Sequence, residues 1–301
     1  MSENLSPIVH DLKRLNLISG KGGVGRSTLA AALARANAAT GKRTLLMEIE
    51  DDSGWDSPLA RMFGLNHFQI EPHEVEPHLY GLCVCASSGQ EKFLNSFLKI
   101  PKLAHLVLSN QGVKWFLEGA PAFKEMGYFY HFLMALKDNF DTLILDMPAT
   151  GHLIGLARLP NILLKMMPVG PIADKLKEGQ SYMYNPELTA AWIVTLPQTL
   201  PVSEAIELKE ALIREHVPVG GFILNKAPFN PFTEEEEKIL ESLTQKSQTK
   251  RLMIDLERIR RLREAEKRLK EEKPFPVWVA PETFNPQEEL DFCSKIQKLD
   301  P

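Results

Sequence analysis

A glycine-rich segment near the N-terminus could hold phosphate groups. Residues 20–28 read Gly-Lys-Gly-Gly-Val-Gly-Arg-Ser-Thr and come where a first strand turns into a first helix. Glycines let consecutive backbone N–H groups curl toward an anion, and the positive end of the following helix points at the same place. The Ser27 hydroxyl is placed to bind Mg²⁺, and Thr28 to contact the α-phosphate. The predicted phosphate site consists of Gly20, Gly22, Gly23, Val24, Gly25, Arg26, Ser27 and Thr28; the alternative is a purely structural turn.

Two cations give this loop its particular character. Lys21 is an extra lysine directly after the first glycine, which resembles the deviant subclass of the Walker A motif. This resemblance implies that Lys21 reaches the phosphates of a facing subunit. Arg26 stands where the P-loop pattern has lysine. Arginine keeps the positive charge but presents a wide planar fork in place of a compact ammonium group. Binding of phosphate is therefore a firmer expectation than fast hydrolysis.

An aspartate at the end of a buried strand is the second chemical signal. The apolar run Thr142–Leu145 predicts a strand, and Asp146 follows it directly. A carboxylate at the carboxyl end of a strand can hold the hydration shell of Mg²⁺, which is the Walker B role, and Gly151 lets the backbone approach the γ-phosphate. We therefore predict Ser27 and Asp146 as the metal-binding pair. The alternative is that Asp146 caps the next helix.

Together these segments resemble the ArsA-type ATPases, a family of deviant Walker A proteins. The resemblance rests on four places: residues 20–28, Asp146–His152, the pair Thr195–Pro197 with Pro201–Glu204, and Asn225-Lys226. It covers residues 15 to about 290. It implies ATP and Mg²⁺ as cofactors, Asn225 as the contact to adenine, and a loop at Pro281 that closes over the base.

The same resemblance implies an acid that orients the attacking water in the segment after the second strand. That segment runs from Glu48 to Asp56 and is longer than in the family pattern, so several acids compete. Glu50, at the strand end, is the first candidate and Asp52 the second. With Lys21 and Asp146, these two acids complete the predicted catalytic set.

Apolar runs alternate with helix-period stretches along the chain. Strands are expected at Leu15–Ile18, Thr44–Ile49, Thr142–Leu145, Ala191–Leu196, Gly221–Leu224 and Val277–Val279, with further ones over Leu79–Ala86 and Phe68–Val75. An alanine-rich helix is expected from Ser27 to Ala39. Strands that alternate with helices in this way indicate an α/β fold with a mostly parallel sheet and helices on both faces. With the loop, this predicts a P-loop NTPase of the deviant Walker A class.

We expect one nucleotide-binding domain over residues 1–301 with two additions. A helical subdomain is predicted at about 89–139; its aromatic and methionine side chains favour core packing, and a surface for a hydrophobic client is the alternative. A long charged helix is predicted at about 233–273. Its apolar residues recur every three or four positions and predict a face that lies on the domain; a partner-binding or dimer-supporting arm is the alternative. The residues of that face are Leu252, Leu256, Ile259, Leu262, Ala265 and Leu269.

Composition limits the classes of function. The chain has 301 residues, 44% hydrophobic and 25% charged, with a formal net charge of −4, so nothing in the balance argues for nucleic acid. Three cysteines are too few for a disulfide framework. Neither a signal peptide nor an apolar run of membrane-spanning length is visible, so we expect a cytoplasmic protein without a transmembrane segment, a peripheral membrane partner being left open.

The sequence thus predicts an ATP-hydrolysing dimeric switch that acts on a protein partner. Because it has one P-loop, it would need a homodimer or a heterodimer with a related ATPase for Lys21 to act across an interface. The first alternative is a low-turnover nucleotide-binding regulator or heterodimer subunit, motivated by Arg26. A kinase acting on a small molecule is a third hypothesis, but no acceptor pocket with a base is apparent.

Overall fold

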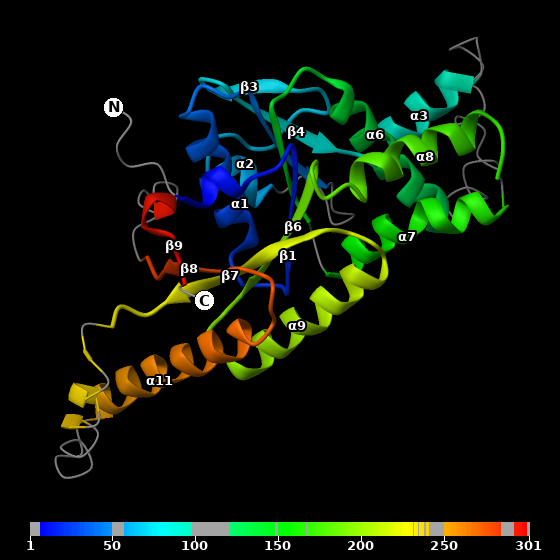
Figure 1. Cartoon of the computed structure of the whole chain (residues 1–301). Helices are drawn as coiled ribbons and strands as arrows, with labels where there is room; N and C mark the ends of the chain where they lie inside the picture. Colours follow the sequence, from blue (N-terminus) through cyan, green and yellow to red (C-terminus); the bar gives the residue numbers. More distant parts are fainter. Residues whose placement is uncertain are drawn as a thin grey trace.

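The computed structural model describes most of the chain as one α/β arrangement (Figure 1). The described residues are 7–49, 57–97, 121–147, 150–166, 168–230, 232–233, 235–237, 239–240, 250–283 and 292–299. Within them, none of the helices combines the length and the apolar character needed to cross a membrane.

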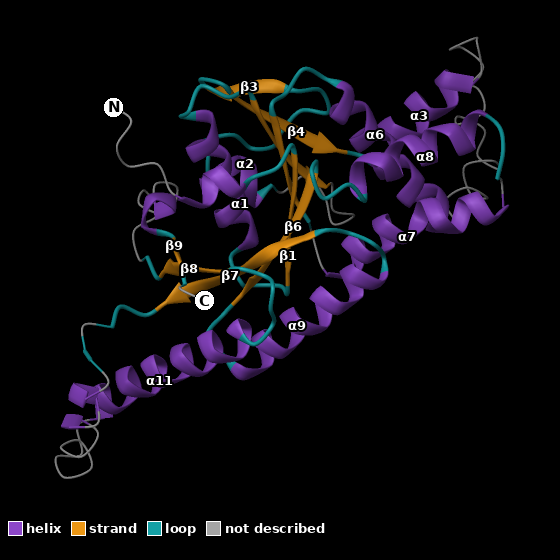
Figure 2. Cartoon of the chain, in the orientation of Figure 1, coloured by secondary structure: helices purple, strands orange, loops and turns teal. Residues whose placement is uncertain are grey.

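A nine-stranded sheet forms the centre of the described part (Figure 2). Its strands are β1 (Leu15–Gly20), β2 (Thr44–Ile49), β3 (His73–Glu76), β4 (Leu79–Val84), β5 (Thr142–Asp146), β6 (Thr189–Thr195), β7 (Val219–Ala227), β8 (Val277–Pro281) and β9 (Gln297–Lys298). The order is β3-β4-β2-β5-β1-β6-β7-β8-β9. All neighbouring strands are parallel except the outermost ones, since β3 and β9 run antiparallel to β4 and β8. The expectation of a mostly parallel sheet is confirmed.

Helices cover both faces of this sheet (Figure 2). The helices are α1 (Arg26–Ala38), α2 (Pro58–Arg61), α3 (Ala86–Phe97), α6 (Pro121–Lys137), α7 (Thr150–Met166), α8 (Pro171–Met183), α9 (Thr199–Arg214) and α11 (Lys250–Lys270), with 3-10 turns at Pro7–Asp11 and Phe292–Lys295. Successive strand residues point to opposite faces. Thus Ile18 of β1 packs with α1 and α2 on one face, whereas Leu17 packs with α6, α7, α8, α9 and α11 on the other.

Most of the expected strands are present, with one addition and one shift. The two-residue strand β9 was not expected. The strand expected over Phe68–Val75 begins only at His73. Phe68 instead turns inward, where its ring lies so close to Gly81 that a Cβ there would be 2.6 Å from the ring. Before His73 the segment has one backbone hydrogen bond to β4, from the Cys83 N–H to the Gln69 carbonyl, and the regular pairing starts at His73.

The aromatic stretch before β5 supplies core on α6. Phe129, Phe132, Leu133 and Leu136 are fully or almost fully buried, as the core reading of this stretch expects. α3 and α6 come so close that a Cβ on Gly89 would lie 1.8 Å from the carbonyl oxygen of Gly127. The remaining part of the predicted subdomain, residues 98–120, lies outside the described residues.

The charged stretch is shorter as a helix than expected. An unbroken helix over residues 233–273 would hold residues 237 and 263 about 39 Å apart. Instead, Nη2 of Arg263 lies 2.8 Å from Oε1 of Glu237, so no single helix holds both residues, and the long helix among the described residues is α11. The predicted apolar face is confirmed within α11, where Leu256, Ile259, Leu262, Ala265 and Leu269 are buried.

Candidate functional site

The glycine-rich loop joins β1 to α1 at the carboxyl edge of the sheet. Gly20 ends β1 beside β6, and a Cβ on it would lie 2.3 Å from the carbonyl oxygen of Val194. Gly25 is the N-cap of α1 with φ of 91°. Gly23 also has a positive φ, of 82°. A Cβ on Gly22 or Gly23 would meet no atom within 4 Å, so the middle of the loop is exposed on the side where a Cβ would point.

Ser27 and Asp146 come together under this loop. The Ser27 hydroxyl, in the first turn of α1, lies near enough to the Asp146 carboxylate at the end of β5 to lower its pKa. Oδ1 of Asp146 is shielded from solvent and has no hydrogen-bond partner in the described structure. Burial raises the pKa of Asp146 to about 6, although the Ser27 hydrogen bond and the Arg26 charge oppose the rise. A hydroxyl and a carboxylate with an unused oxygen fit a magnesium ion, which prefers such ligands.

Arg26 turns its guanidinium group toward the residue after Asp146. Its Nη1 donates a hydrogen bond of 2.6 Å to the carbonyl oxygen of Met147. Burial lowers the pKa of Arg26, and the neighbouring Asp146 charge opposes this shift. A guanidinium group stays protonated in proteins. Arg26 thus links the loop to the segment after β5, 121 residues further along the chain.

Glu48 is a second carboxylate at the same place, and sequence reasoning missed it. It lies opposite Asp146 in the parallel pairing of β2 with β5. Oε2 of Glu48 accepts a hydrogen bond of 2.7 Å from the Ser57 hydroxyl. Burial raises the pKa of Glu48, the Ser57 hydrogen bond lowers it, and the Asp146 charge raises it further. The alternation of side chains along a strand could have found it. Glu48 points to the same face of β2 as Leu46, and Leu46 packs with α1.

Lys21 lies at the exposed rim of the loop. Its Nζ forms an ion pair with Oε1 of Glu204, in the second turn of α9. Half of the Lys21 side chain is exposed. Oε2 of Glu204 is buried without a hydrogen-bond partner in the described residues. The structure thus adds Glu204 to the site as the partner of Lys21 within one chain.

Asn225 connects the other half of the sheet to the loop. Its Nδ2 donates a 2.8 Å hydrogen bond to the carbonyl oxygen of Val24. A Cβ on Gly25 would lie 2.3 Å from the same Nδ2, so the glycine makes room for the amide. Pro281 ends β8 opposite Ala227, and the next backbone N–H, of Glu282, donates to the Ala227 carbonyl. Asn225 and Pro281 therefore both lie at the carboxyl edge, on the far side of β1 from Asp146.

Four predicted residues have roles that no described contact tests. Glu50 and Asp52 lie outside the described residues. Gly151 belongs to the first turn of α7, which follows β5 after Met147. Thr28 is half-buried in the first turn of α1. Their assigned roles stay predictions.

Comparison with known proteins agrees with this geometry. A family model described as anion-transporting ATPase matches residues 13–170, which include the loop, β2 and Asp146. The chain is 27% identical over 225 residues to ATPase BagA of Mycobacterium tuberculosis, covering 71% of this chain and 65% of that protein. It is 28% identical over 240 residues to an arsenical pump-driving ATPase of Escherichia coli, covering 74% and 37%. It is 22% identical over 270 residues to ATPase GET3 of Kluyveromyces lactis, covering 76% of each.

The match thus spans less than two thirds of the length of the first two of these relatives. The family match covers just over half of this chain and includes the phosphate loop together with the buried acid. Fold, loop and acid agree with it: the chain belongs to the ArsA-type, anion-transporting ATPase family.

Proposed function

We propose that this chain binds ATP with Mg²⁺ and hydrolyses it to ADP and phosphate. The observation that carries the proposal is the contact between Ser27 and Asp146 under the open glycine loop, with Oδ1 of Asp146 unused. A hydroxyl and a carboxylate that meet below a ring of backbone N–H groups are the parts that a P-loop NTPase uses for phosphates and metal. The relatives named as ATPases support the same activity.

The residues divide the work by position. Backbone N–H groups of the loop and the start of α1 hold the phosphates, while Ser27 and Asp146 hold the metal, whose charge would offset the charge of the transferring phosphoryl group. Positioning of the water falls to an acid after β2, where Glu50 and Asp52 are the sequence candidates. Glu48 stands beside Asp146 and orders that side of the site through Ser57.

A dimeric switch is the larger function that we infer from this site. Lys21 would complete the site of a second copy or of a related ATPase, and its ion pair with Glu204 holds it in its own chain until that partner arrives. A movement of α7 would then signal to a protein client whether the nucleotide has been hydrolysed. Because α7 begins at Thr150, directly beyond the acid, nucleotide contacts there can move it as a unit. A cytoplasmic location, with or without a peripheral membrane partner, belongs to the same proposal.

The test is phosphate release by the purified full chain with ATP and Mg²⁺, over a range of protein concentrations. Turnover should need Mg²⁺, should vanish with Asp146→Asn, and should rise with protein concentration if the site is completed by a second copy. Asp138→Asn, an exposed aspartate after α6, is the matched control and should keep wild-type turnover. If the chain bound no ATP in the presence of Mg²⁺, the proposal would be wrong.

A low-turnover regulator is the second candidate, and the Arg26 contact favours it. A guanidinium group committed to the Met147 carbonyl is not free to follow the γ-phosphate as a lysine would. Arg26→Lys should then raise turnover about tenfold or more if the contact is what slows hydrolysis. Arg35→Lys, on the same helix but paired with Glu76, controls for the exchange itself. A fall in turnover with Arg26→Lys would show that arginine is the working cation.

A further inference from the structure

Three arginines of α11 reach three different parts of the protein. They are Arg258, Arg263 and Arg268, spaced five residues apart. Five residues turn an α-helix by about 140°, so the side chains leave α11 in different directions. Figure 1 shows α11 on the β7–β8 side of the sheet, with its C-terminal end against the start of α9. The partners of the three arginines all follow strands of this half of the sheet.

Arg258 holds the segment that leaves β8. Its Nη2 forms an ion pair with Oε2 of Glu282, the residue directly after Pro281. The backbone N–H of Glu282 donates to the carbonyl oxygen of Ala227 over 2.8 Å. The ion pair therefore fixes the point where the ends of β7 and β8 meet.

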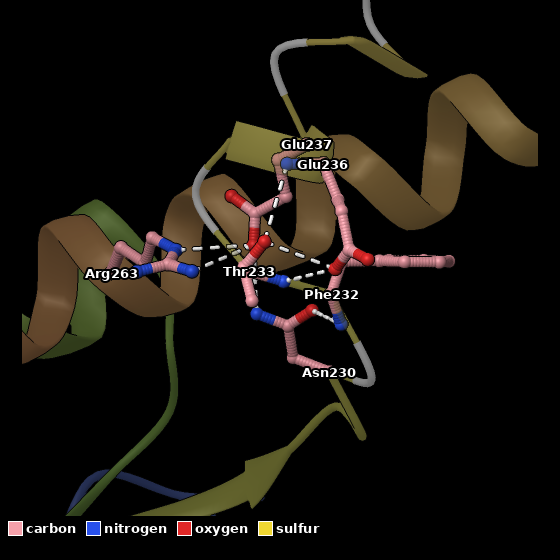
Figure 3. A network of polar contacts seen from close by, with 6 residues as sticks. All are labelled: Asn230, Phe232, Thr233, Glu236, Glu237 and Arg263. Atoms are coloured by element: carbon pink, nitrogen blue, oxygen red, sulfur yellow. Dashed lines mark hydrogen bonds and ion pairs between the residues drawn. The ribbon is translucent and has the colours of Figure 1, made fainter.

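Arg263 holds the segment that leaves β7 (Figure 3). Oε1 of Glu237 accepts from Nη2 of Arg263 and from Nδ2 of Asn230, each over 2.8 Å. Oδ1 of Asn230 in turn accepts from the backbone N–H of Phe232 over 3.0 Å. The Glu237 carboxylate thus contacts both α11 and Asn230, and it links the two ends of the segment from Asn230 to Glu237.

Arg268 holds the start of α9, which follows β6. Its two terminal nitrogens donate to the carbonyl oxygen of Thr199 over 3.2 Å and to the hydroxyl of Ser203 over 3.0 Å. The neighbour of Ser203 is Glu204, the partner of Lys21. α11 thereby contacts, in order along its length, the segments after β8, β7 and β6.

Those three segments follow strands that lie on the other side of β1 from Asp146 and Glu48. The phosphate loop follows β1, and the acids Asp146 and Glu48 stand on β5 and β2, to one side of it. A metal and the γ-phosphate belong with these acids, so the sugar and base extend the other way, toward β6, β7 and β8. Asn225, which ends the buried part of β7, already contacts the loop on that side.

We propose that α11 is a positioning brace for the nucleoside half of the substrate, a purine nucleoside triphosphate. By fixing the segments after β6, β7 and β8 from outside, its three arginines set the walls against which sugar and base rest. They do not touch the phosphates. The inference rests on the proposed nucleotide binding and assigns a role to the charged helix that the phosphate site does not explain.

The test compares binding of ATP with binding of inorganic tripolyphosphate, which carries the phosphates without the nucleoside. The full chain is titrated with each in Mg²⁺ for wild type, Arg258→Gln and Arg263→Gln. Each variant should bind ATP about five- to tenfold more weakly and keep the wild-type affinity for tripolyphosphate. Arg261→Gln is the matched control, because Arg261 pairs within the helix, with Glu257, and should leave both affinities unchanged.

A second variant removes the same ion pair from the other partner. Glu282→Gln should match Arg258→Gln, and the double variant should be no weaker than either single one. Equal losses for ATP and tripolyphosphate, or no loss for ATP, would overturn the brace while leaving nucleotide binding intact. A wild-type chain that binds tripolyphosphate but not ATP would overturn both proposals.

Discussion

Replacement of Asp146 by asparagine should stabilise the fold while abolishing turnover. The Asp146 carboxylate lies half-buried with one oxygen shielded and unpaired, so its negative charge is poorly solvated when no metal is present. Asparagine has nearly the same shape, carries no charge and still offers an oxygen to the Ser27 hydroxyl. The exchange therefore removes the buried charge and leaves the packing largely as it is.

The magnitude follows from the pKa of this carboxyl group. Burial raises the pKa from 3.8 to about 6. At about 1.36 kcal/mol per pH unit, ionised Asp146 lowers the free energy of unfolding by at most about 3 kcal/mol. The folded state holds the proton more tightly than the unfolded state, so this loss is absent below pH 3.8. It grows as the pH rises and is complete above about pH 6.

The assay is urea unfolding of wild type and Asp146→Asn without nucleotide, at pH values from 4 to 8. We expect equal stability near pH 4 and a variant more stable by about 2–3 kcal/mol at pH 8. Titrating groups away from this site act on both proteins alike and cancel in the difference. Glu48, whose pKa the Asp146 charge raises, changes the difference in the same direction. Asp138→Asn, on the surface, should show no such pH dependence.

Added Mg²⁺ and ATP supply a second check on the same residue. They should stabilise the wild type and have a much smaller effect on the variant, because the metal loses its carboxylate ligand. A variant that is less stable than wild type at pH 8 would refute the buried-charge reasoning. A stability difference that is constant from pH 4 to 8 would refute it equally.

Two further predictions concern the loop and the helical side of the sheet. Gly25→Ala should cost about 1–3 kcal/mol of stability and weaken ATP binding at least tenfold, since φ is 91° and the new Cβ would displace the Asn225 amide. Urea unfolding and ATP titration measure these two effects. The control is Gly22→Ala, whose new Cβ would meet no atom within 4 Å and which should leave stability unchanged. Equal losses of stability in the two variants would contradict the prediction for Gly25. His131, whose Nδ1 accepts from the Cys85 N–H over 3.1 Å, has its pKa lowered by burial, so wild type should lose stability as pH falls below 6.5. His131→Gln should flatten this loss in urea unfolding between pH 7 and 5, and an unchanged slope would contradict the assignment.

The sequence predicted the parts of the site that are encoded locally. A buried strand, a glycine loop and an alanine-rich helix follow one another within 24 residues, Leu15 to Ala38, so their order alone indicates where phosphate is held. Asp146 was found in the same way, from the apolar run that precedes it. The apolar face of α11 was found because its period of three to four residues is local as well.

The missing parts depend on pairings between distant residues. Alternation along β2 places Glu48 on the same face as Leu46, but its position opposite Asp146 comes from the register of β2 on β5, which no local pattern states. The contact of Arg26 with Met147 joins residues 121 positions apart, and the Lys21 contact with Glu204 joins residues 183 apart. The contact of Arg263 with Glu237 also joins residues that are distant in the chain, and no local pattern indicates it.

The two outermost strands bear on how this chain can meet another. Free backbone groups at a sheet edge invite a further strand from a second chain. Here one edge ends in β3, four residues long, with a register shift between Glu74 and Glu76, and the other in the two-residue β9. Strands so short and irregular offer few consecutive sites for backbone pairing. If two copies associate as proposed, they should do so through side chains and loops, which can separate again, and not through a shared sheet, which could not.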